Sequence, residues 1–159
     1  MTQDAAVRAC RRPGVLRMDF QPILDTARGT VAGYESLARF SGPPHATPDR
    51  WFAVAHTAGF GAELEARALR VALEARAWLP PNCFLSVNVG PDALTSSPVA
   101  AVFADAGDLR GVVIEITEQT AVACYDALVA ALAPARAAGA LLAVDDAVSY
   151  THLTLPTKA

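Results

Sequence analysis

Oxygen-bearing side chains recur near the ends of apolar segments in this 159-residue chain. Glu115 interrupts the apolar run VVIEIT, and Asn88 interrupts FLSVNV. Asp145 and Asp146 close LLAVDD, and Glu35 lies between Tyr34 and Leu37 in another such segment. A carboxylate is costly to bury unless it is paired, protonated or bound to a metal ion. Each residue alone has an ordinary explanation, as a surface, turn or loop residue, but coincidence at four matching positions is the weaker account.

The chemistry of this set is that of a hard metal site. Its donors are carboxylate and amide oxygens, and no Cys or His lies at ligand spacing, so the set favours Mg²⁺ or Mn²⁺ over Zn²⁺. Two adjacent aspartates allow one of them to bridge two ions. That arrangement supports in-line attack on a phosphodiester. The residues therefore predict a two-metal hydrolytic centre.

Five apolar or alternating segments predict the strands that would position these donors. They are residues 16–24, 30–40, 84–89, 112–117 and 141–145. The turn DTARG between the first two predicts a hairpin. From the third strand on, strands alternate with helical segments, which predicts a parallel sheet in either a barrel or a doubly wound fold. In parallel barrels chemistry is done at the C-terminal ends of the strands.

Helices are predicted at residues 48–57, 62–78, 91–103 and 119–138. Thr47 and Pro48 form an N-cap and N1 pair, and Pro98 predicts a break in the third helix. Gly139 is the expected C-cap of the last helix. Trp51 and Trp78 are expected to pack helices rather than to stack on bases, and Cys83 is expected to be buried.

Composition excludes several classes of protein. Apolar residues make up 53% of the chain and charged residues 18%, so it is not a disordered polymer. A formal net charge of −3 argues against a broad electrostatic surface for DNA or RNA. Three widely spaced cysteines form no CxxC motif, which favours a reducing compartment, the cytoplasm. We find neither a signal peptide nor an apolar run of membrane-spanning length.

Four segments in order resemble the EAL family, the cyclic di-GMP phosphodiesterase domains. They are DFQPILDTARGTVAGYESLARF, FLSVNVGPDAL, VVIEITEQTAV and LLAVDDA, and the helical stretch at residues 47–73 is also similar. The resemblance covers roughly residues 16–147. It implies an α/β fold, a TIM-like (β/α) barrel whose first strand runs antiparallel to the rest. It also implies hydrolysis of cyclic di-GMP to linear pGpG with two Mg²⁺ or Mn²⁺ ions, and a homodimer through the complete domain.

The family's site residues carry over by motif. The resemblance implies that Glu35 and Asn88 bind one ion, that Glu115 is a further ligand, that Asp145 bridges both ions and that Asp146 holds the second. Glu118 would steady the loop after the aspartate pair. Gln21, Leu37 and Arg39 match positions that contact the dinucleotide, and a guanidinium suits phosphate oxygens. Plainer readings stay open: Gln21 could end a strand, Leu37 could be core, and Arg39 could pair with Glu35 along one strand face.

The chain also departs from the family pattern. Ser36 stands where the signature has Ala, a position that carries no ligand, so we expect a small effect. After Asp146 no glycine-bearing loop follows, and the family's catalytic Lys and further Glu have no match, since Lys158 comes too early and in the wrong setting. Roughly the last three βα units of the eight in a barrel are missing.

The expected organisation is a flexible leader at 1–14, the N-terminal part of an EAL barrel domain at 15–147, and a non-native tail at 148–159. The tail is Thr-rich in an otherwise Ala- and Arg-rich chain and brings the sole lysine. We expect the parent protein to be a phosphodiesterase and this fragment to be inactive. The alternative is a degenerate EAL module that binds cyclic di-GMP or a protein partner without catalysis.

Overall fold

The computed structural model describes residues 12, 14–42, 45–116 and 125–144. The strands are β1 (Leu16–Asp25), β2 (Thr30–Phe40), β3 (Phe84–Val89), β4 (Val112–Ile116) and β5 (Leu141–Val144). The helices are α2 (Pro48–Thr57), α3 (Gly61–Ala75), the 3₁₀ turn η1 (Arg76–Trp78), α4 (Pro91–Leu94), α5 (Ser97–Ala106) and α6 (Tyr125–Ala137). All five predicted strands are present.

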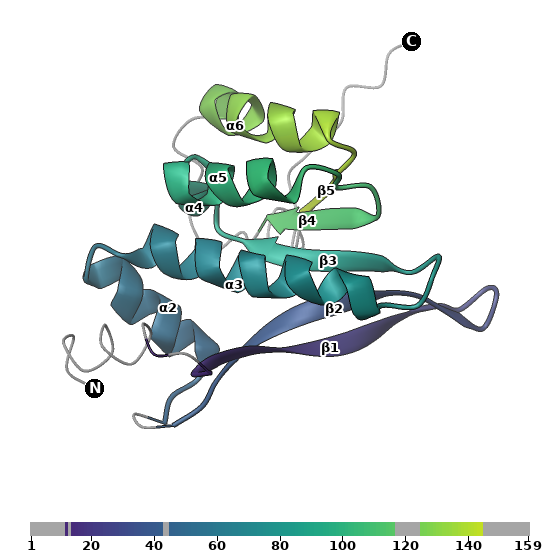
Figure 1. Cartoon of the computed structure of the whole chain (residues 1–159), viewed down its shortest axis with the longest axis horizontal. Coiled ribbons are helices and arrows are strands. Elements are labelled where there is room, and N and C mark those ends of the chain that lie inside the picture. Colours follow the sequence, from purple (N-terminus) through teal and green to yellow (C-terminus); the bar gives the residue numbers. More distant parts are fainter. Residues whose placement is uncertain (1–11, 13, 43–44, 117–124, 145–159) are drawn as a thin grey trace, which may run out of the picture.

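The strands form one sheet in sequence order, β1-β2-β3-β4-β5 (Figure 1). β1 and β2 pair antiparallel as a hairpin, with a register shift between Ile23 and Leu24. Every later pair is parallel. The predicted antiparallel first strand and parallel remainder are therefore confirmed. Because β2 to β5 run the same way, their C-terminal ends meet at one edge of the sheet.

The sheet has an apolar face and a polar face, as the period-2 alternation of strands requires. On the apolar face the side chains are fully or almost fully buried: Leu85, Val87, Val89, Val112 and Ile114. The intervening positions of the same strands carry Ser86, Asn88 and Glu115. This separation places the predicted donors Asn88 and Glu115 together on the face that the helices do not cover.

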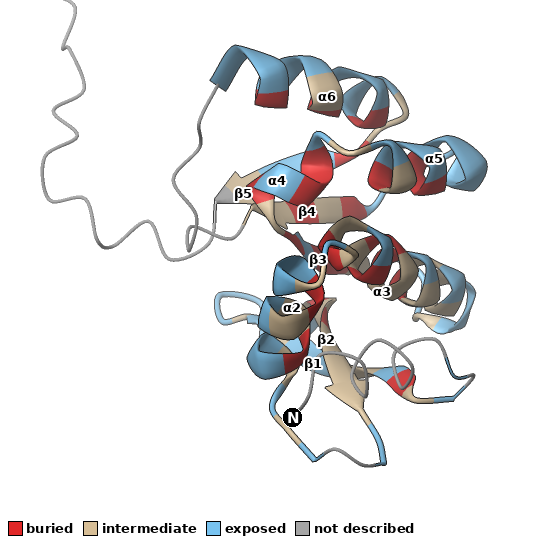
Figure 2. Cartoon of the chain, turned by 90° about the vertical axis from the view of Figure 1, so that its left-hand side faces the viewer, coloured by how far each residue is buried: buried red, intermediate tan, exposed pale blue. Residues whose placement is uncertain are grey.

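The helices pack on the apolar face. α3 lies against β1, β3 and α5, and α5 also contacts α6. Figure 2 shows the buried residues concentrated where helices and strands meet. The main core joins Leu69 of α3, Val102 of α5 and Leu132 of α6 to the buried strand residues. α2 is held separately, because Trp51 stacks on Phe40 of β2 with ring centroids 5.0 Å apart.

Several helix boundaries differ in detail from the sequence-based prediction. The expected break near Pro98 is real and divides α4 from α5, where Ser96 caps α5 by accepting from the Val99 N–H. Thr47 is the N-cap residue of α2, but its side chain makes no capping hydrogen bond. Gly139 follows α6 at φ 104°, a conformation that favours glycine. Residues 119–124 of the predicted last helix lie outside the described residues.

Two predictions about packing are wrong. Trp51 is fully buried as expected, but Trp78 in η1 is 88% exposed and does not pack a helix. Cys83 is half-buried rather than buried, and its thiol donates to the Val31 carbonyl at 3.7 Å. Both residues lie just before β3, where η1 and the PPN turn end the helical packing. Within the described part of the chain, no helix has the length and apolar character needed to cross a membrane.

Candidate functional site

Glu35 and Asn88 meet on the polar face. The Asn88 side-chain amide donates to Glu35 Oε1 at 2.8 Å, joining β2 to β3. Glu35 is half-buried and Asn88 is exposed, so the pair is accessible from solvent. The bond uses Nδ2 of Asn88 and one carboxylate oxygen of Glu35. The Asn88 Oδ1 and Glu35 Oε2 atoms take no part in this hydrogen bond.

Glu115 extends this group to a third strand. It is directly opposite Asn88 in the parallel register of β3 and β4. The Ser86 hydroxyl donates to Glu115 Oε1 at 2.5 Å, and Ser86 is itself fully buried. The sheet register thus places three of the five predicted ligands, Glu35, Asn88 and Glu115, on neighbouring strands and on one face.

The remaining predicted acids cannot be placed. Asp145, Asp146 and Glu118 lie outside the described residues, although β5 ends at Val144, directly before the aspartate pair. Among the described residues, no three His, Cys, Asp or Glu side chains form a group that could hold a metal ion. The described donors are nevertheless two carboxylates and an amide, which is the oxygen chemistry that Mg²⁺ and Mn²⁺ prefer.

A cleft of about 570 Å³ adjoins these residues at the C-terminal ends of β2 and β3. α2 and α3 form its other walls, through residues such as Phe52 and Glu65. Leu37, Arg39 and Asn88 line it. Leu37 is half-buried, so it belongs to the wall of the cleft rather than to the closed core. Gln21 is exposed and is the direct antiparallel partner of Glu35.

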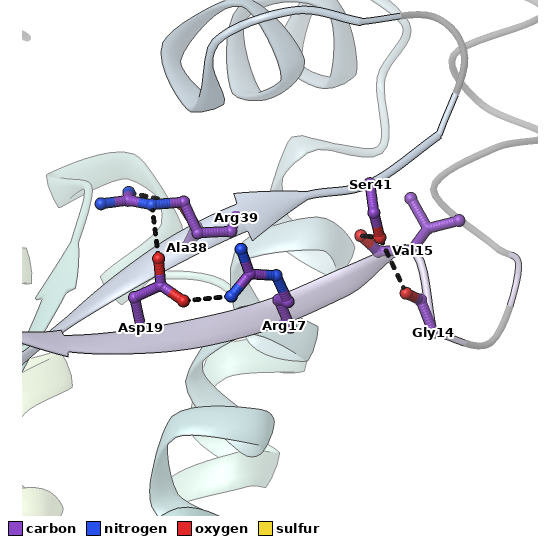
Figure 3. Close-up of polar contacts among 7 residues, drawn as sticks. All are labelled: Gly14, Val15, Arg17, Asp19, Ala38, Arg39 and Ser41. Carbon is purple, nitrogen blue, oxygen red and sulfur yellow. Dashed lines mark hydrogen bonds and ion pairs between the residues drawn. The ribbon is translucent and has the colours of Figure 1, made fainter.

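Arg39 does not pair with Glu35, so that plainer reading is wrong. Its Nε donates to Asp19 Oδ2 at 3.0 Å, and one terminal nitrogen donates to the Ala38 carbonyl at 3.1 Å. Figure 3 shows Asp19 between two guanidinium groups, because Arg17 also binds its other oxygen. Asp19 and Arg39 lie on adjacent strands of the hairpin, two residues out of register, whereas Glu35 is engaged by Asn88.

Three polar residues of this region were missed in the sequence. Ser86 lies two positions before Asn88, and Asp19 two before Gln21, so strand alternation alone placed each on the same face as a predicted site residue. Glu65 gave no such signal. It lies on α3, and its carboxylate reaches the turn after β3, where it accepts from the Gly90 N–H at 2.7 Å. Only the tertiary fold shows that contact.

The EAL domain family model matches residues 3–155 of the chain. The uncharacterized protein y4lL of Sinorhizobium fredii (strain NBRC 101917 / NGR234) is 30% identical over 158 residues, which cover 94% of this chain and 19% of that protein. The chain therefore belongs to the EAL domain family. It spans about a fifth of the length of this relative.

Solved structures agree with this assignment. BlrP1 of Klebsiella pneumoniae, in a manganese and cyclic di-GMP complex at pH 6, is 29% identical with a TM-score of 0.70, covering 91% of this chain and 38% of that one. The PaMucR phosphodiesterase, in a complex with cyclic di-GMP, has a TM-score of 0.79 at 21% identity, covering 95% of this chain and 66% of that one. The five-stranded sheet and its helices correspond to part of the TIM-like barrel of EAL domains.

Proposed function

We propose that this EAL domain binds cyclic di-GMP and, in its complete form, hydrolyses one phosphodiester bond to give linear pGpG. The observation that carries the proposal is the convergence of Glu35, Asn88 and Glu115 from three neighbouring strands onto one face. The manganese and cyclic di-GMP complex of a 29% identical protein supports the same ligand and a divalent ion. We place this activity in the cytoplasm, and a homodimer of the complete domain stays a prediction.

Glu35, Asn88 and Glu115 would hold one Mg²⁺ or Mn²⁺ ion, and Asp145 and Asp146 would complete a two-ion site. Bound divalent ions supply a water nucleophile at neutral pH and offset the charge that develops on the phosphoryl oxygens. The Asn88 amide would have to turn its Oδ1 to the ion while the Glu35 carboxylate stays beside it. Glu118 would steady the loop that follows the aspartates.

The cleft beside these ligands would hold the dinucleotide. Arg39 presents a guanidinium at its wall, and Leu37 adds an apolar surface next to it. A guanidinium fork matches phosphate oxygens in charge and geometry. Gln21, opposite Glu35 on β1, would contribute an amide at the neighbouring position of the same face.

We also propose that the 159-residue chain does not turn cyclic di-GMP over by itself, because it has no match to the family's catalytic Lys and further Glu. The test compares this chain with the product of the complete open reading frame, by chromatographic detection of pGpG in the presence of Mn²⁺. We expect product only from the complete protein, and none from its Glu35→Ala variant. The variant Glu63→Ala, an exposed acid on α3, is the matched control.

Two outcomes would contradict this proposal. Product from the 159-residue chain that Glu35→Ala abolishes would refute the inactivity of the chain. A complete protein that binds cyclic di-GMP with Mn²⁺ but releases no pGpG would instead be a binding module. That result would replace hydrolysis with the alternative function of a degenerate domain.

A further inference from the structure

We infer that Glu65 of α3 is a positioning residue for the candidate metal ligand Asn88, an inference that rests on the proposed function. Among the described residues, the hydrogen bonds of Glu65 go to His56 and Gly90 and not to Glu35, Asn88 or Glu115. Its carboxylate instead binds the backbone of the turn into which β3 runs. Gly90, whose N–H is bound, follows Asn88 by two residues.

Both carboxylate oxygens of Glu65 are engaged. Oε2 accepts from the Gly90 N–H at 2.7 Å, and Oε1 lies 2.9 Å from His56 Nε2 on α2. The Glu65 side chain is only 11% exposed, so water competes little for these bonds. One carboxylate therefore ties α2 and α3 to the end of β3.

Gly90 links the Glu65 carboxylate to the end of β3, two residues after Asn88. It is the N-cap residue of α4, and Pro91, which starts that helix, favours the extended conformation that Gly90 adopts. A Cβ at Gly90 would lie 3.1 Å from Glu65 Oε1 and 3.2 Å from Oε2, closer than ordinary contacts. The carboxylate thus fits against a glycine backbone, and a methyl group there would push it away.

The consequence for Asn88 follows from the short distance along the chain. Asn88 is exposed and is the last residue but one of β3, where it pairs with Glu115 of β4 and its side chain bonds Glu35. Fixing Gly90 fixes the backbone direction at the end of β3, and with it the position of the Asn88 amide beside Glu35. Groups that hydrogen-bond a metal ligand directly change metal affinity by about 10- to 100-fold when removed. Glu65 acts on Asn88 through the backbone two residues away, so we expect an effect at the lower end of that range.

The experiment titrates Mn²⁺ alone into the 159-residue chain and follows free Mn²⁺ by electron paramagnetic resonance. We expect Glu65→Ala to weaken Mn²⁺ binding about tenfold. Glu65→Gln keeps an oxygen for the Gly90 N–H, so the loss should be smaller. Gly90→Ala, which displaces the carboxylate without removing it, should weaken binding too. Glu74→Ala, an exposed acid on the same helix, is the matched control and should bind like the wild type.

A second readout separates this inference from the proposed function. The side-chain amide resonances of Asn88 in the metal-free chain should shift in Glu65→Ala and stay in place in Glu74→Ala. If the wild type binds no Mn²⁺, the proposed metal site fails, and the Asn88 resonances alone decide whether Glu65 positions it. Unshifted resonances, or Mn²⁺ affinity in Glu65→Ala equal to that of the wild type, would overturn the inference. If Glu65→Ala does not fold, Gly90→Ala decides in its place: unshifted Asn88 resonances and wild-type Mn²⁺ affinity in Gly90→Ala would overturn the inference.

Discussion

Replacing Ser86 with Ala removes a hydroxyl that holds the carboxylate of Glu115. Ser86 Oγ lies 2.5 Å from Glu115 Oε1 and 3.5 Å from the Val113 carbonyl. A serine has one O–H to donate, so the much shorter contact identifies Glu115 as the acceptor. The bond is also shielded, because Ser86 is fully buried. Ser86→Ala therefore tests one specific contact behind a candidate metal ligand.

Ser36 provides an internal scale for the expected effect. Ser36 is also buried, but its hydroxyl donates to a neutral acceptor, the Ser86 carbonyl, at 2.9 Å. Neutral hydrogen bonds contribute about 1 kcal/mol net, and bonds to charged groups about 1.5–3 kcal/mol. We therefore expect Ser86→Ala to lower the free energy of unfolding by about 2 kcal/mol and Ser36→Ala by about 1 kcal/mol. Ser36→Ala also restores the usual Glu-Ala-Leu signature of the family, so it should leave metal binding unchanged.

The assay combines urea unfolding of the metal-free chain with a Mn²⁺ titration. Ser86→Ala should weaken Mn²⁺ binding about tenfold, since Glu115 loses a hydroxyl that helps to orient its carboxylate. A tenfold change corresponds to about 1.4 kcal/mol. The reasoning is refuted if Ser86→Ala and Ser36→Ala cost the same stability and both bind Mn²⁺ like the wild type.

Three further changes test other parts of the structure. Asp19→Asn keeps an acceptor for Arg39 but removes a negative charge beside the cleft. Calorimetry should therefore show that the complete protein binds cyclic di-GMP several-fold more tightly. Weaker binding would show that the charge of Asp19 is required. Ile114→Ala empties a fully buried position in β4 and should cost about 2–5 kcal/mol in urea unfolding, against less than about 0.5 kcal/mol for the exposed control Val129→Ala. The hydrogen bond from the Arg110 side chain lowers the pKa of Asp108 from 3.8 to about 2, so this carboxylate stabilises the fold above about pH 4 and the contribution is lost as the pH falls towards 2. Asp108→Asn should flatten that part of the pH dependence of the urea midpoint, and an unchanged slope between pH 4 and 2 would contradict it.

The sequence predicted the strands well, because their signals are local. The apolar runs FLSVNV and VVIEIT are visible without the fold, and the structure places Asn88 and Glu115 near the C-terminal ends of these strands, as predicted. The hairpin followed from the turn chemistry of DTARG, and the break between α4 and α5 from Pro98. That hairpin already implied an antiparallel β1–β2 pair, the alternation of strands and helices implied the parallel remainder, and the family resemblance implied the same arrangement.

The side-chain contacts between elements were harder to predict from the sequence. Arg39 and Glu35 share a strand face, which suggested an ion pair between them. In the structure Arg39 instead bonds Asp19 on β1, and Glu35 accepts from Asn88 on β3. Trp78 was expected to pack a helix rather than to stack on bases, yet it lies in η1, beyond the end of α3, and is exposed. The link from Glu65 to Gly90 joins positions 25 residues apart and has no sequence signature.

The central claim is that carboxylate and amide groups from β2, β3 and β4 hold a divalent ion. Crystals of the chain grown with Mn²⁺, measured at the manganese absorption edge, test it directly. The account predicts an anomalous peak enclosed by the side chains of Glu35, Asn88 and Glu115. No peak there, with those side chains ordered and the Asn88–Glu35 bond intact, would contradict it.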